Sequence, residues 1–310
     1  MRPASVSVVM PVYNAQDYLA QAVQSILDQT YQDFEFIIIN DGSTDKSSSI
    51  LKTYAKKDKR IKLIEQANKG LVASLNRCIK QAEGKYIARQ DADDISERHR
   101  LEKQVTFLDA NPQVVIVGSS IKLMDESGNV LHQHAVLLHD PELRQELLVR
   151  SPFAHGSVMF KRDEAIESGL YVANSWPAED YDFWLRLSQF GQLANLDEYL
   201  YLYREHSQSI SQSNAQRQQA KLKTIQDKAW RQHQRLLFKG KVKLNAYRNL
   251  DMGQLRIERI IDNNLFISKK AWRYGQKSLT FKSLSRLATK GSSYRKTAGK
   301  LKRRIKRNVA

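Results

Sequence analysis

Three aspartates crowd together after one apolar run, in the stretch YIARQDADDI at residues 86–95. The run reads as a buried strand, and Asp91, Asp93 and Asp94 follow it within four positions. Burying like charges without partners is very costly. Such triplets are commonly solvated turns or helix caps, and Asp94 or Ser96 is placed to cap a following helix. Asp91 and Asp93 have no such need, so they indicate a divalent cation, Mg²⁺ or Mn²⁺, shared with substrate phosphates.

A second polar group, NDGSTD at residues 40–45, also follows an apolar run. As structure it predicts a turn, but Asp41 at its start is also suited to accept a hydrogen bond from a nucleobase N–H. The first apolar run ends at Pro11, Val12 and Tyr13, which offer a flat apolar surface for the base, although Tyr13 alone would more often be a packing residue. The candidate nucleoside-binding residues are Pro11, Val12, Tyr13, Asn14 and Asp41.

A third set of acids lies in EDYDFWLRL, which begins at Glu179 and has the spacing of an amphipathic helix. Acids at a helix start favour the macrodipole, so capping explains them without chemistry. The apolar approach Trp176-Pro177-Ala178 nevertheless makes a carboxylate here a candidate general base, with a pKa raised by burial or lowered by a metal. His206 is a candidate ligand of a metal or phosphate, and His155 is a weaker candidate for contact with an acceptor.

These groups need a scaffold, and the first half of the chain predicts one by alternating strands with helices. Strands are predicted over 6–10, 34–39, 61–65 and 86–90, and helices over 17–29, 47–57 and 70–82. This order indicates a mostly parallel sheet covered on both faces. Such sheets bind ligands at the carboxyl ends of their strands, which is where the polar groups collect. A buried run at 114–118, a hairpin turn at 124–131, helices at 140–150 and 179–191, and a loop and strand at 151–160 are expected to follow.

Composition narrows the class of protein. The 310 residues are 41% hydrophobic, and the single Cys78 excludes a disulfide framework and a multi-cysteine metal site. Cys78 lies in a helical pattern and is expected to be a buried structural thiol. No apolar stretch approaches the ~18 residues of a spanning helix, and the opening segment reads as a strand and not as a signal peptide. We therefore expect a cytoplasmic protein.

Charge divides the chain in two. Residues 1–210 carry 23 Lys and Arg against 29 Asp and Glu, whereas residues 211–310 carry 27 against 4, a net charge of +23. We expect a catalytic domain over 1–211 and a basic, mainly helical region over 212–310. The stripe Ala298, Leu301, Ile305 and Val309 would suit a helix lying on an anionic membrane surface. Nucleic acid is the rival partner, but no recognition motif is present.

Five ordered segments together resemble glycosyltransferase family 2, the inverting enzymes of the GT-A fold, over roughly residues 4 to 211. The segments are VSVVMPVYNAQDYLAQAVQSILDQTYQDFEFIIINDGSTD, NKGLVASLNRCIKQAEGKYIARQDADD, SPFAHGSVMF, EDYDFWLRL and YREHSQSIS. Each alone is weak, but their order is very specific. The sequence departs from the common family pattern at three places. Asn40 stands where an acid is common, and Gly156 stands where a proline is frequent in the acceptor loop. The segment SERHR, which follows the acidic motif, lacks the usual proline.

The resemblance implies a nucleotide-sugar donor, most often a UDP-sugar, held by the nucleoside-binding residues above. It places Asp91 near the ribose, makes Asp93 the metal ligand, and matches Asp180 to the general base. It also implies an acceptor hydroxyl on a glycan or lipid-linked molecule of a cell-surface polysaccharide or lipopolysaccharide, which would bring the protein to the inner face of the membrane. His155, Glu179 and Trp176 are the acceptor-site candidates, and Asp93 with His206 the metal candidates.

Two rival functions remain at this point. A nucleotidyltransferase would need a glycine-rich basic loop near the first strand, and MPVYNAQDY lacks one. A non-catalytic or nucleic-acid-binding protein with a transferase-like body is the other alternative, and the presence of Asp91, Asp93 and Asp180 disfavours it. The donor sugar, the acceptor and the oligomeric state do not follow from the residues.

Overall fold

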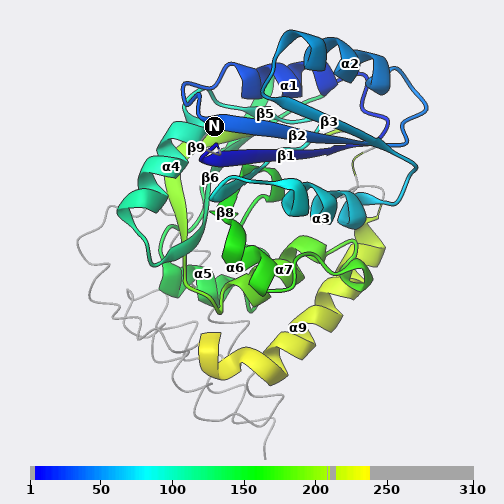
Figure 1. Cartoon of the computed structure of the whole chain (residues 1–310). Coiled ribbons are helices and arrows are strands. Elements are labelled where there is room, and N and C mark those ends of the chain that lie inside the picture. Colours follow the sequence, from blue (N-terminus) through cyan, green and yellow to red (C-terminus); the bar gives the residue numbers. More distant parts are fainter. Residues whose placement is uncertain (1–3, 208, 210–213, 238–310) are drawn as a thin grey trace, which may run out of the picture.

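A computed structural model describes residues 4–207, 209 and 214–237 of the chain (Figure 1). The predicted apolar stripe of Ala298, Leu301, Ile305 and Val309 lies outside these residues, as does most of the predicted C-terminal region. Within the described part, no helix combines the length and the apolar character needed to cross a membrane.

The first half forms the predicted parallel sheet, in the strand order β3-β2-β1-β4. Its strands are β1 (Val6–Val12), β2 (Phe34–Asp41), β3 (Ile61–Gln66) and β4 (Tyr86–Arg89). The helices between them are α1 (Leu19–Leu27), α2 (Ser47–Lys57) and α3 (Leu71–Gln81). Every residue of β2 is buried, as expected for a strand covered on both faces. All seven elements were predicted, with ends shifted by a few residues.

The second half continues the same sheet in mixed directions. The order runs on as β8-β6-β9-β5, with β7 paired to β6 outside this path. These strands are β5 (Ile95–Ser96), β6 (Val114–Met124), β7 (Val130–His134), β8 (Met159–Lys161) and β9 (Gln192–Arg204). The predicted hairpin is the β6–β7 turn. Strand β8 runs antiparallel to both β4 and β6, whereas β9 runs parallel to β6. The sheet is therefore continuous across both halves.

Helices of the second half surround this sheet. They are α4 (Arg100–Ala110), α5 (Asp140–Glu146), α6 (Arg162–Glu167), α7 (Glu179–Leu187) and α9 (Ala215–Leu237), with short 3-10 turns η1 (His155–Ser157) and η2 (Ala173–Ser175). Helix α9 packs on the body: Ile225 is buried, and Gln218 Nε2 donates to the carbonyl of Pro177 at 2.9 Å.

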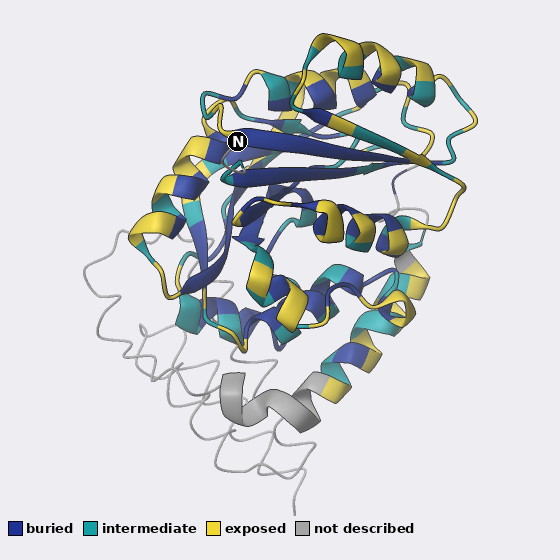
Figure 2. Ribbon diagram, viewed as in Figure 1, coloured by how far each residue is buried: buried dark blue, intermediate teal, exposed yellow. Residues whose placement is uncertain are grey.

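Two hydrophobic layers cover the two faces of the sheet (Figure 2). Alternate residues of each strand point to opposite faces, so Val9 joins one layer and Val8 the other. The layer that holds Val9 also includes α3, α7 and Cys78, which is fully buried, as predicted. Burial raises the pKa of the Cys78 thiol to about 12, so this thiol stays protonated and inert.

Candidate active site

A cavity of about 910 Å³ lies at the carboxyl ends of β1, β2 and β4. Sequence reasoning placed the ligand at these strand ends, and nine predicted site residues line the cavity. They are Pro11, Val12, Tyr13, Asn14, Asp41, Asp91, Asp93, Trp176 and His206. Segments more than 190 residues apart in the chain therefore meet at one site. Three other predicted residues, His155, Glu179 and Asp180, lie outside its lining.

Asp41 closes β2 and is only 3% exposed. Its Oδ1 accepts hydrogen bonds from Gln66 Nε2 at 2.7 Å and the Lys69 backbone N–H at 2.8 Å, and its Oδ2 accepts one from the Gly70 N–H at 2.8 Å. A carboxylate offers about four acceptor positions, so these bonds leave little capacity for a ligand. Asp41 therefore shapes the loop before α3 at the cavity wall, besides facing the cavity.

The end of β1 also forms part of the cavity wall and is tied to a neighbouring turn. Tyr13 is 53% exposed, which leaves its ring open to the cavity instead of in the core. Asn14 adopts a positive φ of 49°, a conformation that asparagine tolerates better than most residues. Its Oδ1 accepts a hydrogen bond from the Thr44 N–H at 2.8 Å, which ties this strand end to the turn after β2. The apolar rim and the polar turn thus form one wall.

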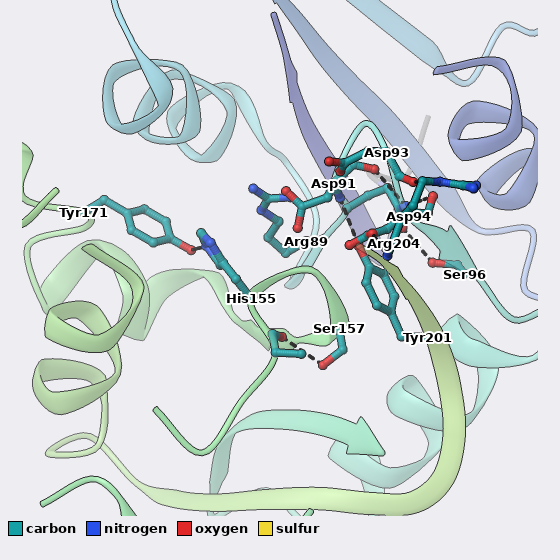
Figure 3. A network of polar contacts seen from close by, with 12 residues as sticks. Arg89, Asp91, Asp93, Asp94, Ser96, His155, Ser157, Tyr171, Tyr201 and Arg204 are labelled. Carbon is teal, nitrogen blue, oxygen red and sulfur yellow. Dashed lines mark hydrogen bonds and ion pairs between the residues drawn. The ribbon is translucent and has the colours of Figure 1, made fainter. Parts of the chain in front are cut away.

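The acidic turn after β4 also lines the cavity, and Figure 3 shows its polar contacts. Asp93 Oδ2 lies 2.8 Å from His206 Nε2, although 113 residues separate them. Asp91 pairs with the guanidinium of Arg89, and its N–H donates to Tyr201 Oη at 3.1 Å. Burial raises the pKa of Asp91, and Arg89 opposes that shift. The charge repulsion noted in the sequence is therefore relieved partly by a buried arginine.

The donor set fits a divalent cation that is shared with a ligand. Among the described residues, no group of three or more His, Cys, Asp or Glu side chains forms a closed metal site. Asp93 and His206 supply one carboxylate and one imidazole on the cavity wall. Mg²⁺ and Mn²⁺ bind through one or two carboxylates together with substrate phosphates, and Mn²⁺ also accepts imidazole. This pair therefore fits such a cation if a diphosphate completes its coordination.

The third aspartate behaves differently from the expectation that it caps a helix. Asp94 is 1% exposed, and its Oδ1 accepts a hydrogen bond from the Arg204 backbone N–H at 2.7 Å. Helix α4 begins only at Arg100 and has no side-chain cap, because Ile95 and Ser96 pair with β9 instead. Burial, together with Asp93 and Asp91, raises the pKa of Asp94 well above its ordinary value.

The candidate base, Asp180, lies in the first turn of α7, a few residues after the cavity residue Trp176. Burial raises the pKa of Asp180 to about 6, and Arg89 acts against this shift. Glu179 is 5% exposed, and burial together with Asp180 raises its pKa to about 7. Two neighbouring carboxyls with raised pKa values are suited to exchange protons near neutral pH. Neither lines the cavity, but both interact electrostatically with Arg89 and Asp91, which do.

His155 does not reach the cavity. Its Nε2 lies 2.9 Å from the hydroxyl of Tyr171, which does line the cavity, and its ring packs edge-on against Trp184. Burial, with a smaller contribution from Arg89, holds the pKa of His155 well below its ordinary value. The neutral imidazole of His155 therefore positions Tyr171. His155 can affect a ligand in the cavity only through that tyrosine.

Sequence reasoning missed several residues of the cavity, Arg89 above all. Arg89 is 1% exposed, and the carboxylate of Asp91 keeps its pKa raised despite burial. Its signal was visible as a cation inside the apolar run YIAR, two positions before the first acid. Tyr171 and Lys69 also line the cavity, but nothing in their local patterns distinguishes them from ordinary loop residues.

The sheet order, the ligand cavity at its parallel strand ends and the acidic turn together define a glycosyltransferase of the GT-A fold. The sequence model described as glycosyl transferase family 2 matches residues 7–169, and the chain belongs to that family. An uncharacterized glycosyltransferase of Haemophilus influenzae is 37% identical over 217 residues, covering 66% of this chain and 67% of that one. The O-antigen biosynthesis glycosyltransferase WbnJ of Escherichia coli is 35% identical over 212 residues, covering 67% and 82%.

Solved structures support the same fold. The TarS 1–349 structure of S. aureus in complex with UDP aligns with a TM-score of 0.57 and 17% identity, covering 90% of this chain and 88% of that one. The mannosyltransferase PcManGT of Pyrobaculum calidifontis, in complex with GDP-Man and Mn²⁺, aligns with a TM-score of 0.59 and 18% identity, covering 94% and 77%.

Proposed function

We propose that this glycosyltransferase moves a sugar from a nucleoside diphosphate donor, with UDP as the expected nucleotide, and inverts the anomeric centre. The observation that carries the proposal is the convergence of three strand ends and the Asp93–His206 pair, 2.8 Å apart, around one cavity. The UDP bound by TarS and the GDP-Man and Mn²⁺ bound by PcManGT support a donor of this class. The O-antigen role in the name of WbnJ supports a surface-glycan acceptor, free or lipid-linked.

Each part of the cavity has a task in this reaction. The apolar rim at Pro11, Val12 and Tyr13 would stack on the nucleobase, and Asp41 fixes the loop that closes that end. Asp93 and His206 would hold a Mn²⁺ or Mg²⁺ ion beside the diphosphate. When bound, such an ion neutralises the charge that develops on the leaving diphosphate.

Asp180 would act as the general base. Its carboxylate takes the proton of an acceptor hydroxyl while that oxygen forms a bond to the anomeric carbon. The bond from this carbon to the phosphate oxygen breaks at the opposite face, and its electron pair leaves with the nucleoside diphosphate. One displacement inverts the configuration and needs no covalent intermediate with the protein. Trp176 and Glu179 would border the acceptor, with Tyr171 held in place by His155.

A screen of donors tests this proposal. Calorimetry and release of nucleoside diphosphate are measured for UDP-, GDP- and dTDP-sugars, with Mn²⁺ or with EDTA, over a panel of sugar and lipid-linked acceptors. We expect one nucleotide class to bind and react, and EDTA to abolish release. Asp180→Asn should lower release by about 10²–10⁴-fold while leaving donor affinity unchanged.

The control is Asp163→Asn, whose side chain is 89% exposed and outside the cavity; it should keep full activity. Full transfer by Asp180→Asn would remove the assigned base. Failure of every nucleotide to bind with Mn²⁺ would refute the donor site itself.

A further inference from the structure

Arg204, the last residue of β9, is buried with 1% of its surface exposed. Arginine is almost never fully buried unless it is paired, and its guanidinium carries five N–H donors in a fixed planar fork. These donors must therefore find acceptors inside the protein. They reach three segments that are distant in sequence: the acidic turn, the β6–β7 turn, and α1 with the residue before it.

The first segment is the acidic turn. Arg204 Nε donates to the backbone carbonyl of Asp93 at 2.9 Å, and the Arg204 backbone N–H donates to Asp94 Oδ1 at 2.7 Å. Two consecutive residues of this turn are thus held by one residue of β9 (Figure 3). Because Arg204 holds Asp93 through its backbone carbonyl, the Asp93 carboxylate is left to pair with His206 on the cavity wall.

The second segment is the β6–β7 turn. Arg204 Nη1 donates to the carbonyls of Asp125 at 3.2 Å and Glu126 at 2.9 Å. This turn is itself well ordered, because Asp125 Oδ1 accepts a hydrogen bond from the Asn129 N–H at 2.8 Å. Neither Asp125 nor Glu126 is among the residues that line the cavity, so this turn supports the guanidinium from outside the lining.

The third segment is α1 with the residue before it. Arg204 Nη2 donates to Gln21 Oε1 at 2.8 Å, and the guanidinium carbon lies 4.5 Å from the centroid of the Tyr18 ring. The same ring lies 5.2 Å from the ring of His206 and lines the cavity. Tyr18 is therefore in contact with both Arg204 and His206.

We propose that Arg204 is a positioning residue that fixes the spacing between Asp93 and His206, and thereby sets the affinity for the divalent cation. It holds Asp93 through that residue's carbonyl, and it holds His206, two residues further along the chain, by anchoring the end of β9. This inference rests on the cation site in the proposed function. Lysine cannot replace it, because one ammonium cannot reach three segments in the directions of the planar fork.

The test compares Arg204→Lys with Arg144→Lys. Arg144 is a matched control outside the cavity: it bonds both Asp140 oxygens at 2.8 and 2.9 Å and the carbonyls of Ser188 and Gly191 at 2.9 and 2.6 Å. Calorimetric titration of MnCl₂ into each full-length protein, with the nucleoside diphosphate that the wild type binds, gives the cation Kd. Urea unfolding gives the stability of each variant.

We expect Arg204→Lys to weaken Mn²⁺ binding by about 10–100-fold, as loss of an outer-shell partner does in other metal sites. Arg144→Lys should lose comparable stability and keep the Mn²⁺ Kd within about twofold. Should Arg204→Lys fail to fold, Gln21→Ala removes one contact of the fork, and a weaker Mn²⁺ Kd in that variant supports the inference. An unchanged Kd in a folded Arg204→Lys or Gln21→Ala protein overturns it. Absence of Mn²⁺ binding by the wild type instead refutes the cation site of the proposed function, and the inference with it.

Discussion

At the scale of the residue, the surroundings of the proposed base Asp180 favour its protonated form. Asp180 must lose its proton before it can accept one from an acceptor, but burial raises its pKa to about 6. Activity carried by Asp180 should therefore fall as the pH drops below about 6, whereas an exposed aspartate would stay ionised to about pH 4. Arg89 is the charge that limits this shift, because a nearby cation favours the ionised carboxylate.

Removal of this charge gives a signed prediction. In Arg89→Gln the pKa of Asp180 should rise further, so the acid limb of kcat/KM should move to higher pH by about one unit. The pH profile is the measurement, because its midpoint does not depend on how much donor binding is lost. Arg150→Gln removes the same charge outside the cavity and should leave the midpoint in place. A limb that stays fixed, or moves to lower pH, in Arg89→Gln would show that Arg89 does not act on the base.

The site residues that could be predicted were those at the carboxyl ends of regular strands. Pro11 and Tyr13 lie at the end of β1, and Asp93 lies in the turn after β4, so topology alone places them at one edge of the sheet. Arg89 stands out only as a cation inside the apolar run YIAR, because its pairing with Asp91 and its effect on Asp180 depend on tertiary contacts that local spacing does not report. Asp41 was expected to face a base, and its hydrogen bonds to the loop before α3 show the additional structural task.

At the scale of the element, η1 and β9 meet where Gly156 touches Tyr201. A Cβ atom on Gly156 would lie 1.9 Å from Tyr201 Oη and 2.7 Å from Asp91 Oδ2. The 3-10 turn η1 therefore has no room for a side chain at Gly156. Tyr201 is fully buried and cannot swing away.

Gly156→Ala should therefore destabilise the fold by about 1–3 kcal/mol, the usual effect of overpacking. Tyr201→Phe deletes the hydroxyl that the new methyl group meets. The double variant should consequently be more stable than the sum of the two single losses predicts, by about 0.5–3 kcal/mol. Urea unfolding of the four proteins measures this coupling. Strict additivity would mean that the contact is relieved by other movements.

Elements of the first half were predictable because each strand and helix shows its own period. The second half was harder for a physical reason. Strand β9 shows no clear alternation of buried and exposed residues. It pairs with β6 along most of its length and with β5 near its end, and its register with β6 shifts. Ser96 was expected at a helix start but lies in β5, where it pairs with Tyr201. This pairing joins residues more than 100 positions apart, so the local sequence gives no sign of it.

At the scale of the whole molecule, charge is unevenly divided between a slightly acidic body and a last third with a net charge of +23. We propose that this region brings the enzyme to an anionic membrane surface, where lipid-linked acceptors reside. Each basic residue near such a surface contributes about 1 kcal/mol, and salt screens the attraction.

Sedimentation of the full-length chain with vesicles checks this proposal. We expect binding to phosphatidylglycerol vesicles at 50 mM NaCl, strong weakening at about 500 mM, and none to phosphatidylcholine. Substitution by Gln at four C-terminal positions should reduce binding, whereas the same change at four exposed positions of the body should not. These positions are Lys302, Arg303, Arg304 and Lys306, and Lys56, Lys57, Lys59 and Lys80. Retention of DNA without retention of vesicles would favour the nucleic-acid alternative.

The seclusion of Cys78 has a practical consequence for all of these measurements. Because the chain has no other cysteine and this thiol is inert in the core, maleimide dyes should leave the native protein unmodified. A cysteine introduced at Ala173, exposed on the cavity rim, would then carry a single fluorophore beside the nucleotide. Donor capture and product departure could be followed optically, without first deleting a natural side chain.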